Sequence, residues 1–180
     1  MLDRFYEAMA TEIAGAGGTV EKFVGDAVMA VFGAPHAQED HAERALHAAL
    51  AMRRRLAELF EGSLQLRIGV NSGEVVVGAA REGSSFVTGD TVNVCARLEQ
   101  NVEAGEILAG ERTVALVRGA FEFDEPIRID AKGKRIACRQ LIRALTLTRP
   151  RGVARLRSGR RLWTAQPAMR PVTARAAAST

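Results

Sequence analysis

The sequence predicts an α+β domain in which helices cover one face of a mainly antiparallel sheet. Residues 3–16 and 39–60 repeat apolar side chains every three or four positions, which is the period of a half-buried helix. Short apolar runs within residues 18–33 and 64–70 are bounded by glycine-containing turns, a pattern typical of strands and hairpins. With 180 residues and an apolar content of 47%, the chain is long enough to bury one substantial core.

The first expected element is a helix over residues 3–16. Its apolar side chains Phe5, Met9 and Ile13 are spaced four apart, so they fall on one helical face. Glycines in residues 15–18 then end the helix.

Residues 18–33 predict a tight β-hairpin. Two apolar runs are joined by Gly25-Asp26-Ala27, and a glycine-containing connection of this length is typical of a hairpin loop. On the first strand, one face is expected to carry Val20, Lys22 and Val24. We therefore expect Lys22 and Asp26 to border one cleft, with Asp26 presented at the hairpin tip as a candidate metal ligand.

The middle of the chain continues with a helix and a second expected hairpin. Residues 39–60 begin with acidic and end with basic side chains, an order that suits the helix dipole. Residues 64–70 alternate apolar and polar side chains as a half-buried strand does, and residues 74–79 are expected to pair with them across Asn71-Ser72-Gly73.

The remaining elements are shorter. After a polar loop at residues 80–85, Asp90 or Thr91 can cap a helix. The expected elements are a helix over 92–102, a strand at 107–108, a helix near 111–117, and strands around 121–123, 127–129 and 137–142.

Charge divides the chain into a domain, residues 1–145, and a basic tail, residues 146–180. Residues 149–180 carry eight Arg and no acid, so 17 basic and 21 acidic residues remain in the first 148, a net charge of −4 against +4 for the whole. Hydrophobic periodicity disappears in the tail, so we expect it to be disordered. With Trp163 as its one aromatic residue and no nucleic-acid motif, specific nucleic-acid binding is not expected.

The sequence leads us to expect neither a membrane-spanning segment nor a secretory signal. No apolar run reaches the roughly 18–20 residues of a membrane-spanning helix, and the N-terminus has no basic-then-apolar signal pattern. We therefore expect no membrane partner and a cytoplasmic location. Cys95 and Cys138 form no metal-binding or redox motif, and two free thiols are expected.

Three ordered blocks resemble class III nucleotide cyclases, the adenylyl and guanylyl cyclase family. The residue 18–33 hairpin is similar to the family's second-strand hairpin. Arg67-Ile-Gly-Val-Asn-Ser-Gly-Glu-Val-Val-Val-Gly78 resembles its next hairpin, and Thr88-Gly-Asp-Thr-Val-Asn-Val-Cys-Ala-Arg-Leu-Glu99 its transition-state helix. The resemblance implies a ferredoxin-like cyclase fold and conversion of ATP to cyclic AMP and pyrophosphate. It also implies an active site shared across a homodimer.

The same resemblance implies roles for individual residues. Asp26 binds catalytic Mg²⁺ or Mn²⁺, Lys22 reads the purine, Asn93 orients the ribose, and Arg97 meets charge developing on the α-phosphate. Two further residues are assigned to substrate binding, Thr88 and Lys134. Lys134 belongs to a Lys-Gly-Lys turn that resembles the one reaching the triphosphate tail in the family.

The residues taken alone leave structural alternatives open for each of these positions. A turn Asp can bond to its own backbone, and Asn93 and Arg97 can be surface groups, the latter paired with Glu99 or Glu103. Lys134 can be a solvated turn residue. Lys22 favours ATP over GTP by resemblance, whereas Phe86 stands where many members carry Asp or Thr and removes hydrogen-bond discrimination there.

One family block has no counterpart in this sequence. The first strand, of general form Phe-Ala-Asp-Leu-x-Gly-Phe-Thr, carries a second metal-binding Asp and lies in the middle of the family's sheet. Asp3 is followed by no glycine-rich turn and does not replace it. We therefore expect an N-terminally truncated domain that lacks this strand. The alternative function is an inactive nucleotide-binding or dimerisation fragment of a larger cyclase-containing regulator.

Overall fold

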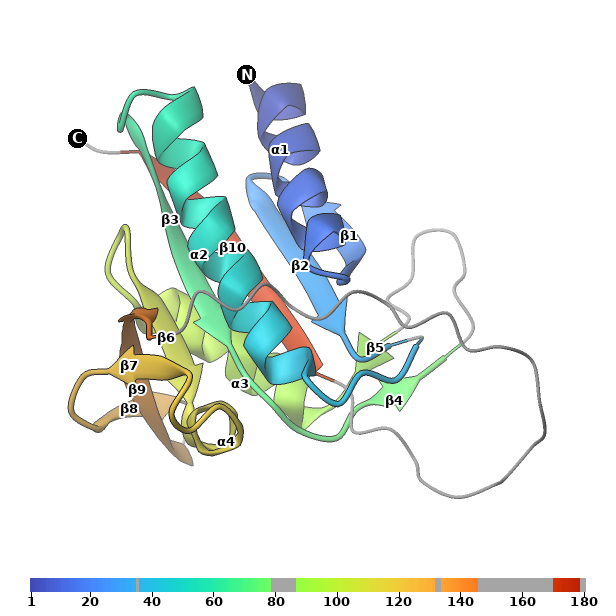
Figure 1. Ribbon diagram of the computed structural model, residues 1–180, viewed down its shortest axis with the longest axis vertical. Coiled ribbons are helices and arrows are strands. Elements are labelled where there is room, and N and C mark those ends of the chain that lie inside the picture. Colours follow the sequence, from blue (N-terminus) through green and yellow to red (C-terminus); the bar gives the residue numbers. More distant parts are fainter. Residues whose placement is uncertain (35, 79–86, 132–133, 146–169, 179–180) are drawn as a thin grey trace.

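The described part of the chain contains an eight-stranded sheet with two helices packed together on one face and a third helix on the other (Figure 1). The computed structural model describes residues 1–34, 36–78, 87–131, 134–145 and 170–178. The expected α+β class, a mainly antiparallel sheet with packed helices, is confirmed. The helices are α1 (Leu2–Gly15), α2 (His41–Leu59), α3 (Asp90–Asn101) and α4 (Glu111–Leu116).

The strands of the main sheet follow the order β1-β2-β10-β3-β6-β9-β7, and β8 also pairs with β9. Their bounds are β1 (Thr19–Val24), β2 (Ala27–Phe32), β3 (Leu64–Val70), β6 (Ile107–Gly110), β7 (Phe121–Phe123), β8 (Ile127–Ala131), β9 (Lys134–Ala144) and β10 (Arg170–Ala178). A separate small ribbon pairs β4 (Val76–Val77) with β5 (Val87–Thr88). The β3–β6 pair is parallel and the other pairs are antiparallel.

Parallel pairing of β3 and β6 explains the position of α3. Two neighbouring parallel strands need a crossover connection, and α3 lies within that connection. Ile68 and Gly69 are consecutive in β3 and therefore point to opposite faces of the sheet. Ile68 belongs to the core beneath α1 and α2, whereas Gly69 faces the backbone of α3. The sheet is thus covered on both faces at β3.

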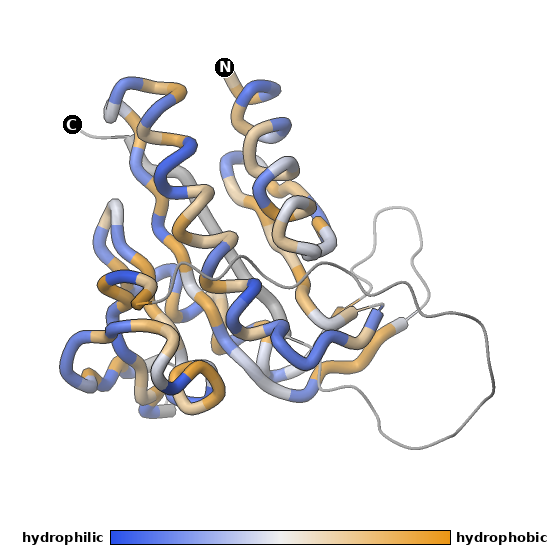
Figure 2. The backbone as a smooth tube through the Cα atoms, in the orientation of Figure 1, coloured by the Kyte–Doolittle hydropathy of each residue, from blue (hydrophilic) through white to orange (hydrophobic). Residues whose placement is uncertain are grey.

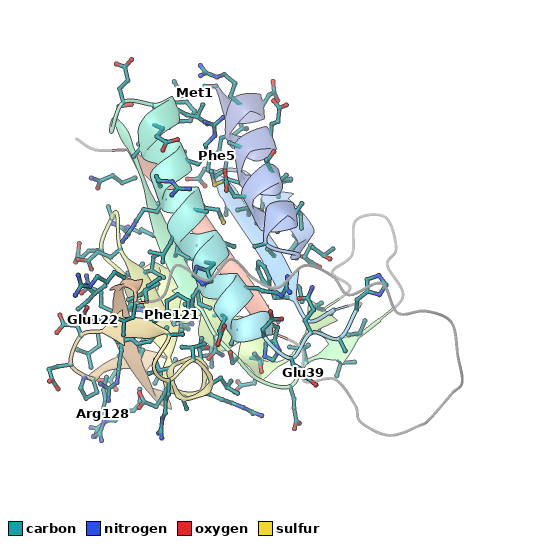
Figure 3. The ribbon with its side chains drawn as sticks, in the orientation of Figure 1. Met1, Phe5, Glu39, Phe121, Glu122 and Arg128 are labelled. Atoms are coloured by element: carbon teal, nitrogen blue, oxygen red, sulfur yellow. The ribbon has the colours of Figure 1, made fainter. Side chains whose placement is uncertain are left out.

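The main core lies between α1, α2 and the facing side of the sheet. Met9 and Ile13 of α1 are fully buried there, as are Phe32 of β2 and Leu46 of α2. Phe5 lies between the two helices (Figure 3) and is 3% exposed. Figure 2 shows the corresponding pattern, with apolar and polar colours alternating along both helices as their amphipathic sequences require.

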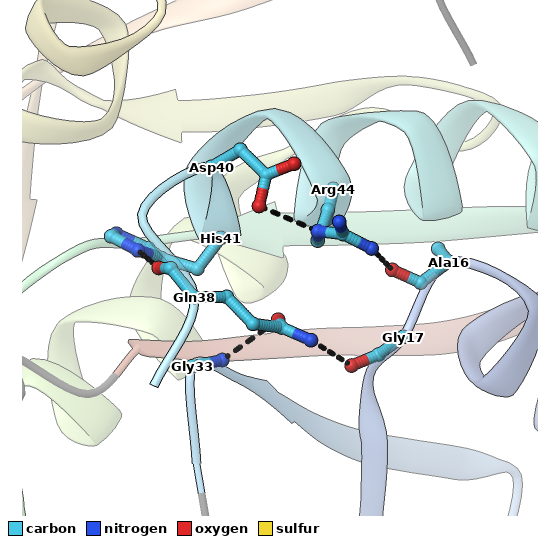
Figure 4. Close-up of polar contacts among 7 residues, drawn as sticks. All are labelled: Ala16, Gly17, Gly33, Gln38, Asp40, His41 and Arg44. Atoms are coloured by element: carbon cyan, nitrogen blue, oxygen red, sulfur yellow. Dashed lines mark hydrogen bonds and ion pairs between the residues drawn. The ribbon is translucent and has the colours of Figure 1, made fainter. Parts of the chain in front are cut away.

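A partly buried polar network ties the end of α1 to the start of α2 (Figure 4). Arg44 Nε donates to Asp40 Oδ1 at 2.6 Å, and its Nη1 donates to the Ala16 carbonyl at 3.3 Å. Gln38 Nε2 donates to the Gly17 carbonyl at 2.9 Å, while its Oε1 accepts from the Gly33 amide at 3.3 Å. The network therefore fixes the turn through which α1 enters β1.

The expected pairing of residues 74–79 with β3 is wrong. Both edges of β3 are occupied, by β10 on one side and β6 on the other, so no edge is free for a hairpin partner. Val76 and Val77 pair with β5 instead. The residues after β3 are redirected by buried contacts in which Asn71 Nδ2 donates to the Thr91 carbonyl at 3.1 Å and Thr91 Oγ1 donates to the Glu74 carbonyl at 2.6 Å.

Residues 170–178 fall within the segment expected to be the C-terminal tail. They form β10, which lies between β2 and β3 in the interior of the sheet (Figure 1). The rest of the expected tail, residues 146–169 and 179–180, lies outside the described residues. Strand β10 is stabilised because both of its backbone edges gain a ladder partner, which offsets the weak hydrophobic pattern of this segment. The middle of the sheet, where an empty position was expected, is therefore filled from the C-terminal side.

Candidate active site

The β1–β2 hairpin presents Asp26 at its apex. Val24 pairs with Ala27, so the turn contains two residues, and Gly25 at its first position has φ +58°. A two-residue hairpin turn requires positive φ there, which glycine adopts without strain. Asp26 is half-buried at the second position. The expected place of Asp26 at a hairpin tip is therefore the observed one.

Tyr6 holds this apex against α1. Its hydroxyl donates to the Gly25 carbonyl, and its ring lies 4.3 Å from the ring of Phe23 between centroids. Tyr6 is not among the site residues that the sequence predicts. Tyr6 directly follows the apolar Phe5, so it lies at the border of the buried helical face. This position is the sequence feature that could have predicted a contact between Tyr6 and the hairpin.

Lys22 is exposed on β1 and faces the side of the sheet opposite α1 and α2. A β-bulge between Val20 and Lys22 shifts the register, so Val20 pairs with Ala30 and contacts the core, whereas Lys22 pairs with Met29. The expectation that Val20 and Lys22 share a face is therefore wrong. The bulge inserts one unpaired residue and reverses the alternation of faces.

Glu21, the residue at this bulge, is a second carboxylate of the hairpin and is not among the predicted site residues. Its Oε2 lies 3.9 Å from Lys22 Nζ, and its side chain is 0% exposed while that of Lys22 is 44% exposed. The two side chains therefore form an ion pair on this strand. Because β-bulges have no strict sequence signature, alternation alone could not reveal it.

Asn93 and Arg97 lie on α3, as predicted, beside its buried stripe. Cys95 and Leu98 are fully buried under the helix, whereas Asn93 is exposed and Arg97 is half-buried. Arg97 Nη1 donates to Gln100 Oε1 at 2.7 Å, so neither expected partner, Glu99 or Glu103, is the one seen in this contact. The helix begins at Asp90 with Gly89 as its N-cap, and no side chain caps it.

Thr88 and Lys134 lie on two other elements. Thr88 is exposed on β5, two residues before α3, and its backbone pairs with Val76. Lys134 is the first residue of β9 and pairs with Ala131 of β8. Phe86 lies outside the described residues, so the expectation for purine selection at that position stays a prediction.

Four of the six candidate residues fall into two groups on different parts of the sheet. Lys22 and Asp26 belong to the edge hairpin, whereas Asn93 and Arg97 belong to α3, which packs against β3 and β10. Two strand spacings, about 10 Å, separate β2 from β3 across β10. The site therefore offers a carboxylate and an ammonium group in one place, and an amide and a guanidinium group in another.

The hairpin apex fits a divalent ion that arrives with a nucleotide. Mg²⁺ is usually held by one or two carboxylates together with substrate phosphates, and Asp26 supplies one such carboxylate at an accessible turn. Among the described residues, no group of three or more His, Cys, Asp or Glu side chains could hold a metal ion. Residues 170–178, which pair with β2 next to this apex, contain no acid. The described residues thus fit a substrate-borne ion better than a resident one.

Comparison with known proteins identifies a family whose members share these blocks. The family model described as Adenylate and Guanylate cyclase catalytic domain matches residues 1–143. Adenylate cyclase 1 of Rhizobium meliloti (strain 1021) is 35% identical over 150 residues, covering 76% of this chain and 22% of that protein. An adenylate cyclase of Mycobacterium tuberculosis (strain ATCC 25618 / H37Rv) is 32% identical over 138 residues, covering 74% of this chain and 31% of its own length. The chain therefore spans less than a third of these relatives.

Solved structures give the same result. The adenylyl cyclase CyaB from P. aeruginosa superposes with a TM-score of 0.73 at 30% identity, covering 79% of this chain and 80% of that one. The guanylyl cyclase Cya2 superposes with a TM-score of 0.72 at 29% identity, covering 78% and 77%. No helix in the described part of the chain is long and apolar enough to cross a membrane. The profile match, the relatives and the fold agree that this chain belongs to the adenylate and guanylate cyclase catalytic domain family.

Proposed function

We propose that the chain is a cytoplasmic nucleotide cyclase domain that converts ATP to cyclic AMP and pyrophosphate at sites shared between two copies. The observation that supports this most is the division of the candidate residues. One group lies on the edge hairpin and the other on α3, and each group supplies only half of the required chemistry. A two-fold dimer can bring the hairpin of one copy to α3 of the other, which makes two equivalent sites.

In the proposed reaction the ribose 3′-oxygen attacks the α-phosphorus. The new oxygen–phosphorus bond closes the ring, the bond to the β-phosphate oxygen breaks, and the 3′-hydroxyl proton leaves to solvent or pyrophosphate. Negative charge grows on the α-phosphate and on the leaving group. A bound divalent ion supplies charge neutralisation for the triphosphate when it is present.

The residues of this chain would act on the bound nucleotide. Arg97 donates to the α-phosphate oxygens as their charge grows, and Asn93 holds the ribose hydroxyl in line. Asp26 anchors the metal–triphosphate complex. The first two side chains are four residues apart on one face of a rigid helix, which preserves their relative position.

Substrate recognition would fall to three further residues. Lys22 contacts the purine, oriented by its ion pair with Glu21. Thr88 lies beside the start of α3, and Lys134 would reach the triphosphate tail. Relatives named adenylate cyclase and guanylyl cyclase both occur, so the preference for ATP depends on Lys22.

A second candidate function is a catalytically inactive nucleotide-binding or dimerisation module. One observation favours it, because the strand beside the Asp26 apex contains no acidic residue and offers no second carboxylate. Such a module would bind Mg²⁺–ATP without turnover.

Turnover by the purified chain decides between the two. We expect cyclic AMP from ATP with Mn²⁺ or Mg²⁺, and less cyclic GMP from GTP. Arg97→Ala should lower the rate about 10²–10³-fold, as loss of one transition-state charge donor does, with an unchanged melting temperature. Arg118→Ala, which changes an exposed Arg after α4, is the matched control and should keep full activity. Nucleotide binding without any cyclic product from a folded chain would instead establish the inactive module.

A further inference from the structure

The hairpin apex that carries Asp26 is held from one side by α1. Tyr6 of α1 donates its hydroxyl hydrogen to the carbonyl oxygen of Gly25. Its ring is tilted against that of Phe23 on β1, with 4.3 Å between the ring centroids. On the helix side, Phe5 is 3% exposed and its ring lies 5.8 Å from that of Tyr6. The base of the Tyr6 side chain therefore packs against the core, and its tip reaches the turn.

The turn at this apex belongs to a class with two backbone forms. Gly25 has φ +58°, whereas Glu61 is the one described residue other than glycine with positive φ, so Asp26 has negative φ. This combination is the type II′ pattern. A type I′ turn has positive φ at both central residues, a conformation that Asp tolerates. The two forms share the φ of the first residue and differ by a rotation of the central peptide of roughly 150–170°.

Tyr6 contacts this central peptide. The Gly25 carbonyl and the Asp26 amide nitrogen belong to one planar unit, so a hydrogen bond to the carbonyl fixes the plane of the whole unit. The same plane sets φ of Asp26, and hence the direction in which its carboxylate leaves the backbone. Because a rotated peptide would aim its carbonyl away from α1, the bond from Tyr6 is made in the type II′ form alone.

Packing around the turn does not oppose this rotation. A Cβ at Gly25 would meet nothing within 4 Å, and Val24 is 60% exposed. Among the described strands, β1 pairs with β2 alone, so the hairpin lies at the edge of the sheet. Glycine also has the greatest backbone freedom of all residues. A contact from outside the hairpin can therefore decide between the two forms, and Tyr6 supplies one.

We propose that Tyr6 is a positioning residue, which holds the Gly25–Asp26 peptide in the type II′ form and so aims the Asp26 carboxylate at a divalent ion bound to the nucleotide triphosphate. This inference rests on the proposed function, in which Asp26 anchors the metal–triphosphate complex. Tyr6 acts through the backbone of the turn and contacts neither the ion nor the nucleotide. Loss of its hydroxyl should weaken binding of the metal-bound nucleotide and leave binding of the metal-free nucleotide unchanged.

Titration calorimetry with the α,β-methylene analogue of ATP, whose bridge between the first two phosphates cannot be cleaved, measures binding without turnover. Tyr6→Phe keeps the ring and removes the hydroxyl. We expect the Kd for the Mn²⁺-bound analogue to rise about three- to tenfold, the usual effect of one lost hydrogen bond. The Kd for the analogue in EDTA should stay unchanged.

The matched control is Thr11→Val, which removes another hydroxyl from α1. Thr11 donates to the Glu7 carbonyl of its own helix, away from the hairpin, so both Kd values should stay unchanged. The carbon chemical shifts of Gly25 and Asp26, which depend on φ and ψ, give a readout without any ligand. They should move in Tyr6→Phe and stay in place in Thr11→Val.

A double-mutant cycle shows whether Tyr6 acts through Asp26. Asp26→Asn should weaken binding of the Mn²⁺-bound analogue. Adding Tyr6→Phe should then have no further effect, because the carboxylate that Tyr6 positions is already gone. A general loosening of the fold would instead add to the effect of Asp26→Asn.

Three results would overturn the inference. If Asp26→Asn weakened binding of the Mn²⁺-bound analogue and Tyr6→Phe did not, Tyr6 would have no positioning role while the proposed function stayed intact. Additive losses in the double variant would make Tyr6 a structural residue. If Asp26→Asn itself left the affinity unchanged, the proposed function of Asp26 would fail and the role of Tyr6 with it.

Discussion

At the residue scale, the absence of a side chain at Gly69 sets how closely α3 approaches the sheet. A Cβ built at this position would lie 2.4 Å from the Cys95 carbonyl oxygen and 2.6 Å from the Glu99 amide nitrogen. Cys95 Sγ also donates to the Gly69 carbonyl at 3.2 Å. These neighbours are helix backbone, so a larger residue would displace the helix that carries Arg97.

Gly69→Ala should therefore lower the free energy of unfolding by about 1–3 kcal/mol, the usual cost of overpacking a tight contact. Activity should fall as well, because α3 shifts. The matched control is Gly15→Ala, since a Cβ at Gly15 meets nothing within 4 Å and alanine favours a helix. Chemical denaturation measures both. Equal stability of the two variants would mean that α3 adapts without strain.

His47 makes stability depend on pH. Burial lowers the pKa of His47, an effect that Glu43 partly opposes, and the His47 ring lies 4.9 Å from that of Phe121. The unfolded chain therefore binds the proton more readily than the folded one. This contribution to stability is present above the ordinary pKa of about 6.5 and is lost as pH falls below it.

We expect His47→Leu to flatten the decrease in melting temperature between about pH 7 and pH 5. His36→Gln, at an exposed position, should leave that decrease unchanged. Differential scanning calorimetry at a series of pH values measures the effect. Parallel curves for the unsubstituted chain and His47→Leu would show that other groups cause the pH dependence.

At the element scale, Arg44 couples the α1–β1 turn to α2. Arg44→Ala removes the ion pair with Asp40 and the donor to the Ala16 carbonyl, so it should cost about 2–3 kcal/mol of unfolding free energy. Arg54→Ala breaks an exposed i,i+4 pair with Glu58 on the same helix and should cost less than about 0.5 kcal/mol. Urea denaturation compares the two, and similar losses would refute a special role for the partly buried network.

Elements with strong periodicity could be predicted from the sequence, whereas those defined by distant pairing could not. Helix α2 buries a periodic apolar pattern and strand β2 a continuous one, and both were predicted within two residues. Residues 74–79 look like a hairpin partner for β3, but that prediction ignored competition for its edges. The composition of β10 resembles a solvated tail, and only an unfilled position between β2 and β3 could have suggested a strand there.

The candidate site divides in the same way. Local spacing correctly placed Asp26 at a hairpin apex and Asn93 above Arg97 on one helix. The contacts of Tyr6 and Glu21 depend on packing and on a bulge, which local spacing does not encode. The clearest example of a feature that local spacing misses is the position of Val20 and Lys22 on opposite faces of β1. One inserted residue at the bulge reverses the alternation of side chains along the strand.

At the scale of the whole molecule, the two groups of candidate residues predict complementation between inactive variants. Mixing Asp26→Asn with Arg97→Ala should restore up to about one quarter of the unsubstituted activity. Half of randomly paired dimers are then mixed, and each mixed dimer contains one intact site of two. Cyclic AMP formation after subunit exchange is the measurement.

The control mixture combines Asn93→Ala with Arg97→Ala. Both changes lie on α3, so every site in a mixed dimer keeps one of them and no activity should return. If neither mixture regained cyclase activity although subunit exchange was demonstrated, each site would be built within a single chain.

The central position of β10 also bears on how the chain folds as it leaves the ribosome. Val28 and Ala174 are ladder partners although 146 positions separate them in the chain. Contacts over such distances form slowly, because loop closure precedes their stabilising effect. Every other described strand is synthesised earlier. Until β10 is synthesised, the edges of β2 and β3 that face it have no backbone hydrogen-bond partner. The nascent protein therefore passes through a stage vulnerable to aggregation, during which a chaperone that shields strand edges would raise the yield of native protein.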